Sequence, residues 1–172
     1  MKSDYVIMCG GFGSRLKPFT YIIPKPFLTT NDISPFEYSL SNILQNKRIG
    51  KIFVTAFYKK TFIKKIIDRK KKKIKKIELV VEEQPLGTAG GLRLIINKSK
   101  CSHIIVINGD LFAKVNFSKL ITEHEKKKSD MTICIKSHKI KIPYAVMSRK
   151  KNLINFKEKP ILNKKINTGI YI

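Results

Sequence analysis

The sequence predicts an α/β fold in which helices cover a mainly parallel sheet. Two observations lead to this class: short apolar runs rich in β-branched residues, such as Ile104-Ile105-Val106-Ile107, and longer amphipathic stretches that alternate with them. The chain has 172 residues, 42% of them hydrophobic, which is enough for a buried core and excludes a disordered protein. We therefore expect a single domain over residues 1–172.

The N-terminal half alternates strands with helices. Phe36, Leu40 and Ile43 recur at helical spacing, whereas the strands are short β-branched runs. A glycine-rich turn and a loop through Pro24 and Pro26 follow the first strand. The predicted elements are a strand over 5–9, a helix over 36–46, a strand over 51–56, a helix over 61–69, an exposed charged connection over 69–76 and a strand over 77–81.

The C-terminal half begins with a loop over 84–88 and a helix over 89–96. The strand predicted over 103–108 contains a continuous apolar run, which is typical of a central strand buried on both faces. Ser118 is the expected N-cap of a helix that ends near residue 127. Four more strands follow without an intervening helix, over 131–135, 145–148, 153–156 and 167–172.

The net charge of +24 raises the question of a nucleic-acid partner. Of the 36 basic residues, 31 are Lys and five are Arg, whereas base and phosphate recognition more often uses Arg. We therefore expect no nucleic acid as partner. The alternative would predict salt-dependent DNA or RNA affinity through the charged run over 69–76.

Cysteine usage and hydropathy indicate the compartment. Cys9, Cys101 and Cys134 are odd in number and widely spaced, and they lack metal-binding spacing, so we expect free thiols in a reducing environment. The apolar stretch after Met1 is too short for a signal sequence, and no run of about 18 apolar residues occurs. These features favour a cytoplasmic protein without a membrane partner.

A glycine-rich segment, Gly10-Gly11-Phe12-Gly13-Ser14-Arg15-Leu16, directly follows the first predicted strand. Glycines there let backbone N–H groups approach phosphate oxygens. The spacing is neither that of a P-loop nor that of a dinucleotide fingerprint. Arg15 and Lys25 add two cations, and Lys25 is held between Pro24 and Pro26. Amides and cations together suit a triphosphate.

These residues, with Pro24-Lys25-Pro26, resemble the signature of the sugar-1-phosphate nucleotidylyltransferases, also called nucleotide-sugar pyrophosphorylases. Four further blocks match in order: 82–91 (EEQPLGTAGG), Asn108-Gly109-Asp110, Glu158-Lys159-Pro160 and Asn167-Thr168-Gly169. The resemblance implies a Rossmann-like three-layer sandwich with a mostly parallel central sheet, the nucleotide-diphospho-sugar transferase fold. It also implies attack of a sugar 1-phosphate on the α-phosphorus of a nucleoside triphosphate, with loss of pyrophosphate.

The resemblance assigns expected roles at the nucleotide. Arg15, Lys25 and Asp110 would be catalytic, and Asp110 would bind Mg²⁺, the expected cofactor. Mg²⁺ commonly takes only one or two protein carboxylates, and open α/β sheets bind ligands at the carboxyl ends of their strands. The expected nucleotide-binding residues are Gly10, Gly11, Gly13, Ser14, Arg15, Glu82, Gly87, Thr88 and Gly109.

Glu82 is expected to read the base, assisted by the backbone at Gly87. A carboxylate only accepts hydrogen bonds, so it fits the N1 and N2 donors of guanine and favours GTP. If Gln84 were the reader instead, its amide would suit uracil or thymine, and UTP or dTTP would be the substrate. The sequence alone leaves this choice open.

The resemblance places the sugar phosphate on a third set of residues: Ala145, Glu158, Lys159, Asn167 and Thr168. Ala145 stands where the family usually has Gly, so a methyl group would lie beside the sugar. As a set the blocks most resemble mannose-1-phosphate guanylyltransferase-type members. The expected partners are a nucleoside triphosphate and a sugar 1-phosphate, and the oligomeric state is left open, a homodimer included.

The chain is short for this family. Members usually continue past Asn-Thr-Gly and supply a second metal-binding Asp, whereas here only Asp130 follows Asp110. We therefore expect a nucleotidyltransferase domain over 1–172 that lacks the usual C-terminal part. The alternative is a catalytically impaired relative that binds or senses nucleotide without turnover.

Overall fold

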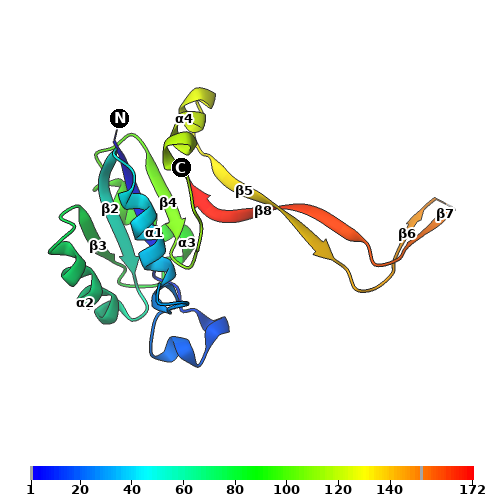
Figure 1. The fold of residues 1–172 in the computed structure, drawn as a ribbon, viewed down its shortest axis with the longest axis horizontal. Helices are drawn as coiled ribbons and strands as arrows, with labels where there is room; N and C mark the ends of the chain where they lie inside the picture. Colours follow the sequence, from blue (N-terminus) through cyan, green and yellow to red (C-terminus); the bar gives the residue numbers. More distant parts are fainter. Residues whose placement is uncertain (1, 152) are drawn as a thin grey trace. The chain divides into compact units, whose positions relative to one another are not determined.

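The computed structural model describes residues 2–151 and 153–172. The chain divides into two compact units. The first comprises Met1–Thr132 with Gly169–Ile172, and the second comprises Ile133–Thr168. Figure 1 labels the helices and strands of both units.

The first unit holds the alternating strands and helices that the sequence predicts. Its helices and initial strands are β1 (Ser3–Met8), α1 (Pro35–Leu44), β2 (Ile49–Ala56), α2 (Lys60–Lys71), β3 (Ile77–Val81), α3 (Gly87–Ile96), β4 (Ile104–Asn108) and α4 (Phe117–Lys127). Three short 3₁₀ helices lie between β1 and α1: η1 (Ser14–Leu16), η2 (Phe19–Tyr21) and η3 (Lys25–Phe27). Among the described residues, none of the helices combines the length and apolarity needed to cross a bilayer.

The main sheet has six strands in the order β3-β2-β1-β4-β8-β5, where β5 is Ile133–Lys141 and β8 is Ile161–Tyr171. β1 pairs in parallel with β2 and with β4, and β2 pairs in parallel with β3. β8 pairs antiparallel with β4 through Val106↔Tyr171 and Ile107↔Ile170. The prediction of a mostly parallel sheet flanked by helices is confirmed.

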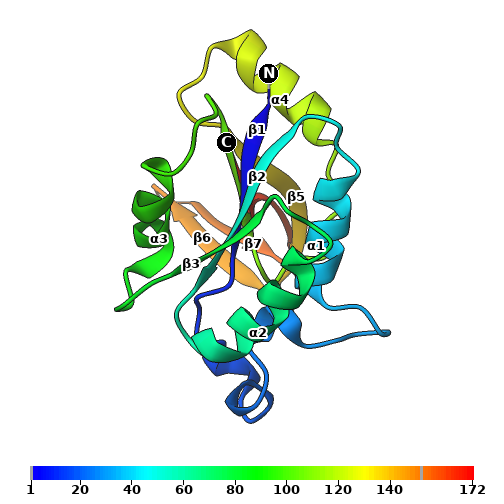
Figure 2. The same ribbon diagram turned by 90° about the vertical axis from the view of Figure 1, so that its left-hand side faces the viewer.

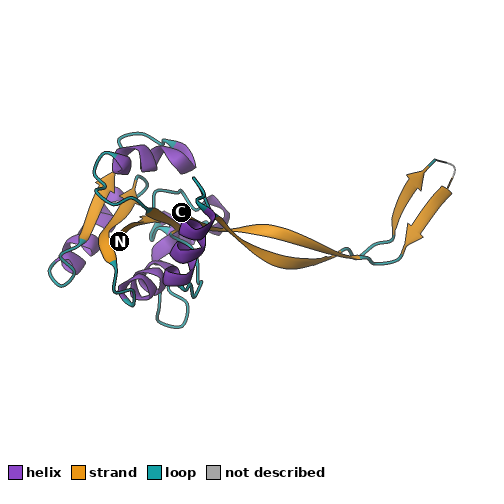
Figure 3. Ribbon diagram, turned by 90° about the horizontal axis from the view of Figure 1, so that it is seen from above, coloured by secondary structure: helices purple, strands orange, loops and turns teal. Residues whose placement is uncertain are grey.

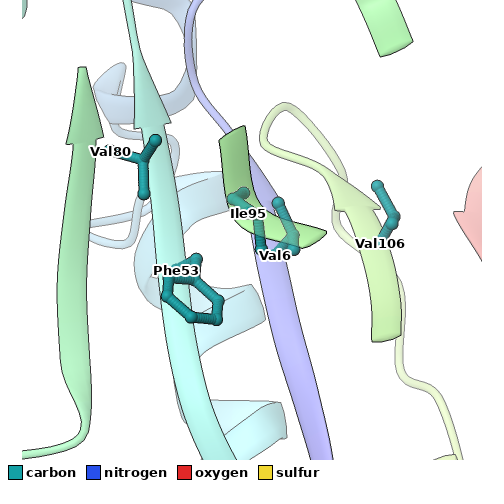
Figure 4. Packing of buried hydrophobic residues seen from close by; sticks show 5 residues of the cluster. All are labelled: Val6, Phe53, Val80, Ile95 and Val106. Atoms are coloured by element: carbon teal, nitrogen blue, oxygen red, sulfur yellow. The ribbon is translucent and has the colours of Figure 1, made fainter. Parts of the chain in front are cut away.

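Helices cover both faces of the parallel strands, and Figure 2 shows α3 on one side and α1 and α2 on the other. Because neighbouring residues of a strand point to opposite faces, alternate residues feed two cores. On the α3 side, Ile95 packs with Val6, Phe53, Val80 and Val106 (Figure 4). All five are nearly or fully buried.

The second unit contains β5, β6 (Val146–Lys150), β7 (Leu153–Lys157) and most of β8. β6 and β7 form a separate antiparallel hairpin (Figure 3). In this hairpin Met147 pairs with Phe156. The described residues of this unit contain no helix, as predicted, and β5 and β8 are both longer than expected.

Most of the predicted element boundaries are wrong by one or more residues. The charged connection expected from residue 69 is helical as far as Lys71. α4 is capped by Asn116, whose side chain accepts a hydrogen bond from the N–H of Lys119 at 3.0 Å, so Ser118 lies inside the first turn. α3 begins at Gly87, two residues earlier than expected, and this glycine has a positive φ of 73°, which its missing Cβ allows.

Candidate active site

A cavity of about 480 Å³ opens in the first unit at the carboxyl ends of its parallel strands. From β1 the chain continues to β2 and β3 on one side of β1, and it then returns to form β4 on the other side. The strand order therefore reverses between β1 and β4. Ligands of open α/β sheets bind at such a reversal. The cavity is lined by Met8, Gly10, Gly11, Phe12, Gly13, Ser14, Arg15, Leu16, Lys25, Pro26, Thr55, Phe57, Glu82, Pro85, Gly87, Asn108, Gly109 and Asp110.

The glycine-rich loop over 10–13 forms one wall. Gly13 is left-handed, with φ 63°, and a Cβ there would lie 2.9 Å from Cγ2 of Thr20, so no other residue fits without strain. Within the described residues, no N–H group of 10–13 donates to a protein acceptor. Unpaired, closely spaced N–H groups beside a cavity are suited to an anion.

Gly109 lets β4 end against β1. Its N–H donates to the carbonyl of Met8 at 2.9 Å, and a Cβ on Gly109 would lie only 2.4 Å from that oxygen. Cys9 lies beneath this contact, fully buried. Burial raises the pKa of the Cys9 thiol far above its usual range, and the negative charge of Asp110 raises it further.

Two charged side chains meet across the cavity. Lys25 of η3 and Asp110, two residues past β4, form an ion pair. Neighbouring contacts fix the segments that carry Lys25 and Asp110. On the Lys25 side, Phe27 of η3 packs against Phe36 of α1 with ring centroids 4.8 Å apart. On the other side, Asn42 of α1 donates from Nδ2 to the carbonyl of Ala113 at 3.2 Å, which anchors the segment after Asp110.

Glu82 immediately follows β3 and is only 6% exposed, yet it lines the cavity. Its N–H donates to the carbonyl of Ala56 at 2.8 Å, which fixes the backbone. Two glycines make room for the carboxylate, since a Cβ on Gly91 would lie 2.7 Å from Oε1 and one on Gly10 would lie 3.2 Å away. Among the described residues, no protein group forms a hydrogen bond or ion pair with this carboxylate. The carboxylate can therefore accept hydrogen bonds from a ligand or water in the cavity.

The structure brings most of the predicted catalytic and nucleotide-binding residues together. Ten of them line the cavity: Gly10, Gly11, Gly13, Ser14, Arg15, Lys25, Glu82, Gly87, Gly109 and Asp110. The side chain of Thr88 lies outside what the structure describes. Gln84, the alternative base reader, is exposed and is not among the lining residues.

The predicted sugar-phosphate residues all belong to the second unit. The register Val146↔Lys157 puts Ala145 and Glu158 at the same end of the β6–β7 hairpin. Glu158 and Lys159 form an exposed ion pair of 3.9 Å. On β8, Thr168 donates from Oγ1 to the carbonyl of Cys134 at 2.8 Å, next to Asn167. Their roles stay predictions.

Sequence reasoning overlooked several lining residues. Asn108, Thr55 and Phe57 all lie at or next to a strand end. Asn108 was already part of a matched block, and Thr55 and Phe57 flank the end of a predicted strand. The rule that parallel strands end at one edge of the sheet would have found them.

The cavity offers few protein ligands for a divalent cation. No cluster of three or more His, Cys, Asp or Glu side chains suited to a metal occurs in the described part of the chain. Asp110 is one-third exposed toward the cavity, and its carboxylate already binds a cation, the amine of Lys25. One carboxylate fits Mg²⁺ held chiefly by phosphate oxygens and water.

Comparisons with known proteins agree with this fold. The sequence pattern of the nucleotidyl transferase family matches residues 4–172. A D-glycero-alpha-D-manno-heptose 1-phosphate guanylyltransferase of Aneurinibacillus thermoaerophilus is 30% identical over 171 residues, which are 98% of this chain and 74% of that protein. A mannose-1-phosphate guanylyltransferase of Mycobacterium tuberculosis is 32% identical over 76% of this chain and 36% of its own length.

A solved structure is similar as well. HddC from Yersinia pseudotuberculosis, crystallised in complex with GMP-PN, matches with a TM-score of 0.70 and 26% identity, covering 98% of this chain and 75% of that one. The fold and the cleft thus define an α/β protein with a ligand cavity at the reversal of its sheet. The chain belongs to the nucleotidyl transferase family.

Proposed function

We propose that the protein transfers GMP from GTP to a sugar 1-phosphate, giving a GDP-sugar and pyrophosphate. A phosphate oxygen of the sugar 1-phosphate forms a bond to the α-phosphorus as the bond to the pyrophosphate oxygen breaks. Such a displacement needs no covalent enzyme intermediate, so the protein must position two anions and neutralise their charge. We further propose that residues 1–172 act as one nucleotidyltransferase domain.

The choice of GTP rests on one observation, the buried carboxylate of Glu82 that has no protein partner within the described residues. Guanine offers two adjacent donors, N1–H and the N2 amino group, which a carboxylate accepts together. Cytosine has a single exocyclic amino donor, and uracil presents carbonyls on either side of N3–H, which a carboxylate repels. The two curated relatives described above are guanylyltransferases by name, which supports this choice.

The triphosphate would lie along the glycine-rich loop. The free N–H groups of residues 10–13 would donate to its oxygens, and the guanidinium of Arg15 would neutralise charge that grows on the departing pyrophosphate. Lys25 would hold the α-phosphate or the incoming sugar phosphate once it leaves Asp110.

Asp110 would hold the cation. When bound there, Mg²⁺ would withdraw charge from the phosphate oxygens that share it. The protein's own part is to fix the carboxylate, which Asn42 supports through Ala113 and Gly109 supports through its contact with Met8. Ala145, Glu158, Lys159, Asn167 and Thr168 are proposed to bind the sugar phosphate.

Ranking the four ribonucleoside triphosphates by thermal stabilisation with Mg²⁺ tests the nucleotide. A ligand at 100 times its Kd stabilises the folded state by about 2.7 kcal/mol, which separates a good ligand from a poor one. GTP is expected to raise the melting temperature most. A larger shift with UTP would overturn the assignment of the base to Glu82 and favour the Gln84 alternative.

A further inference from the structure

Tyr58 lies two residues past β2, outside the matched motifs, and contacts the glycine-rich loop from its outer side. Its N–H donates to the carbonyl of Gly10 at 3.3 Å. Its hydroxyl donates to the carbonyl of Thr20 at 2.8 Å. Its ring packs on Phe12, with centroids 5.5 Å apart. One side chain and its backbone thus reach both the start and the middle of the loop.

Thr20 extends this connection to the end of the loop. It is 1% exposed, and its Oγ1 donates to the carbonyl of Gly13 at 3.1 Å. A continuous chain therefore runs from the Tyr58 hydroxyl through Thr20 to Gly13. Neither Tyr58 nor Thr20 lines the cavity, so both can act only through the loop.

The direction of these bonds matters for the loop's chemistry. They hold the carbonyls of Gly10 and Gly13 toward Tyr58 and Thr20, where they cannot repel an anion. The N–H groups of 10–13 have no protein acceptor among the described residues. A loop whose first and last carbonyls are hydrogen-bonded away from the cavity, and whose N–H donors are free, is preorganised to bind phosphate.

We infer that Tyr58 and Thr20 are positioning residues that hold the glycine-rich loop in its anion-binding conformation. The inference rests on the proposed function for the identity of the anion, a nucleoside triphosphate. The conformation of the loop itself is independent of the proposed function, because the hydrogen bonds from Tyr58 and Thr20 are present in the unliganded protein.

Tyr58→Phe is the sharpest test because it removes only the hydroxyl and keeps the ring on Phe12. The matched control is Tyr21→Phe in η2, since Tyr21 is 56% exposed and its hydroxyl makes no hydrogen bond within the described residues. The amides of Leu16 and Tyr58 donate to the carbonyls of Gly13 and Gly10 at 2.9 and 3.3 Å, so their hydrogen–deuterium exchange reports on the loop. In the unliganded protein this exchange is expected to quicken in Tyr58→Phe and to stay at the wild-type rate in Tyr21→Phe.

Binding and kinetics provide a second readout. One hydrogen bond is worth about a two- to tenfold change in equilibrium, so the Kd of GTP with Mg²⁺ should rise by that factor in Tyr58→Phe. The KM for the nucleotide should rise in step, while the KM for the sugar 1-phosphate and kcat stay unchanged. A general loss of stability would instead affect both substrates.

Thr20 supplies the complementary variants. Thr20→Val should loosen the loop as Tyr58→Phe does, and Thr20→Ser, which keeps the hydroxyl, should restore nucleotide affinity. The two hydrogen bonds act in series, so breaking either one already releases the loop. The double variant Tyr58→Phe/Thr20→Val should therefore lose little more nucleotide affinity than the single variant that binds nucleotide less tightly.

The inference is overturned if exchange of the Leu16 and Tyr58 amides in Tyr58→Phe equals that in Tyr21→Phe, or if the KM values of both substrates rise equally. Its failure is distinguishable from failure of the proposed function. If the wild-type protein releases no pyrophosphate with any nucleotide, the function is wrong, and the exchange rates of the unliganded loop still decide whether Tyr58 holds it.

Discussion

Lys25 and Asp110, 85 residues apart in the chain, form an ion pair at the mouth of the same cavity. In the proposed reaction each must exchange this partner, Lys25 for a phosphate and Asp110 for a cation. Binding of phosphate to Lys25 and binding of a cation to Asp110 should therefore favour each other, because each ligand breaks the ion pair and frees the residue that binds the other ligand.

Replacing Lys25 with Met separates the two effects. We expect turnover to fall by about 10²-fold, the usual loss when one charge-stabilising donor is removed. Affinity of the unliganded protein for Mn²⁺, measured by electron paramagnetic resonance, should rise because Asp110 loses its competing amine. Lys64→Met, which breaks only the exposed 2.7 Å pair with Asp68 on α2, is the control and should change neither value. Unchanged Mn²⁺ affinity in Lys25→Met would contradict the reciprocal relation.

Asp110→Asn keeps the shape of the side chain and removes its charge. Turnover should drop by about 10³-fold and no longer respond to Mg²⁺ concentration, which a pyrophosphate assay measures. Asp130→Asn provides the comparison, since Asp130 is absent from the cavity lining. If Asp130→Asn were as damaging as Asp110→Asn, the assignment of the cation to Asp110 alone would be wrong.

Glu82→Gln tests the reading of the base. An amide has only one acceptor oxygen and adds two donors, so the variant should bind GTP at least about tenfold more weakly, as expected for loss of a charged hydrogen bond. Binding of UTP should improve. Gln84→Glu makes the opposite change in the same loop, and the ranking of nucleotides in that variant should match the wild type. Retained GTP preference in Glu82→Gln would be the contrary result.

Two glycines of the loop should behave differently when each is replaced with Ala. Gly13→Ala places a Cβ at φ 63° and 2.9 Å from Thr20, so we expect the protein to lose about 1–2 kcal/mol of stability or more. Gly11 has no atom within 4 Å of an added Cβ, so Gly11→Ala should melt near the wild-type temperature while binding nucleotide more weakly. Urea unfolding and GTP titration distinguish these outcomes, and equal stability of the two variants would contradict the geometry.

The thiol of Cys9 should resist modification. Burial raises its pKa, so in the native protein it stays protonated at pH 8 and iodoacetamide should label it only after unfolding. Since the unfolded thiol ionises near pH 8.5 and the folded one does not, the free energy of unfolding should fall as pH rises above that value. Peptide mass spectrometry measures the labelling. Rapid labelling of Cys9 in the native protein would contradict the burial of this thiol beneath Gly109.

Much of this arrangement could be predicted from local sequence. The strand over 77–81 was placed correctly at both ends because its apolar run is bounded by charged residues. The glycine-rich loop, Glu82 and Asp110 were expected near one another because parallel strands end at a common edge. A cavity does enclose them, although their chemical roles stay predictions.

Contacts distant in sequence could not be predicted. Neither the Lys25–Asp110 pair nor the hydrogen bond from Tyr58 to Thr20 has a local signature, since each depends on how loops fold back onto the sheet. The cap of α4 was misplaced for a different reason, because Asn116 and Ser118 are both good capping residues and local sequence does not rank them.

Pyrophosphate release tests the central claim most directly. The protein is incubated with Mg²⁺, a panel of sugar 1-phosphates that includes mannose 1-phosphate and heptose 1-phosphates, and each nucleoside triphosphate in turn. The proposal predicts release that requires both substrates, is fastest with GTP, and is lost in Asp110→Asn. Binding of GTP without release of pyrophosphate for any sugar would contradict it and would leave a nucleotide-binding protein without transferase activity.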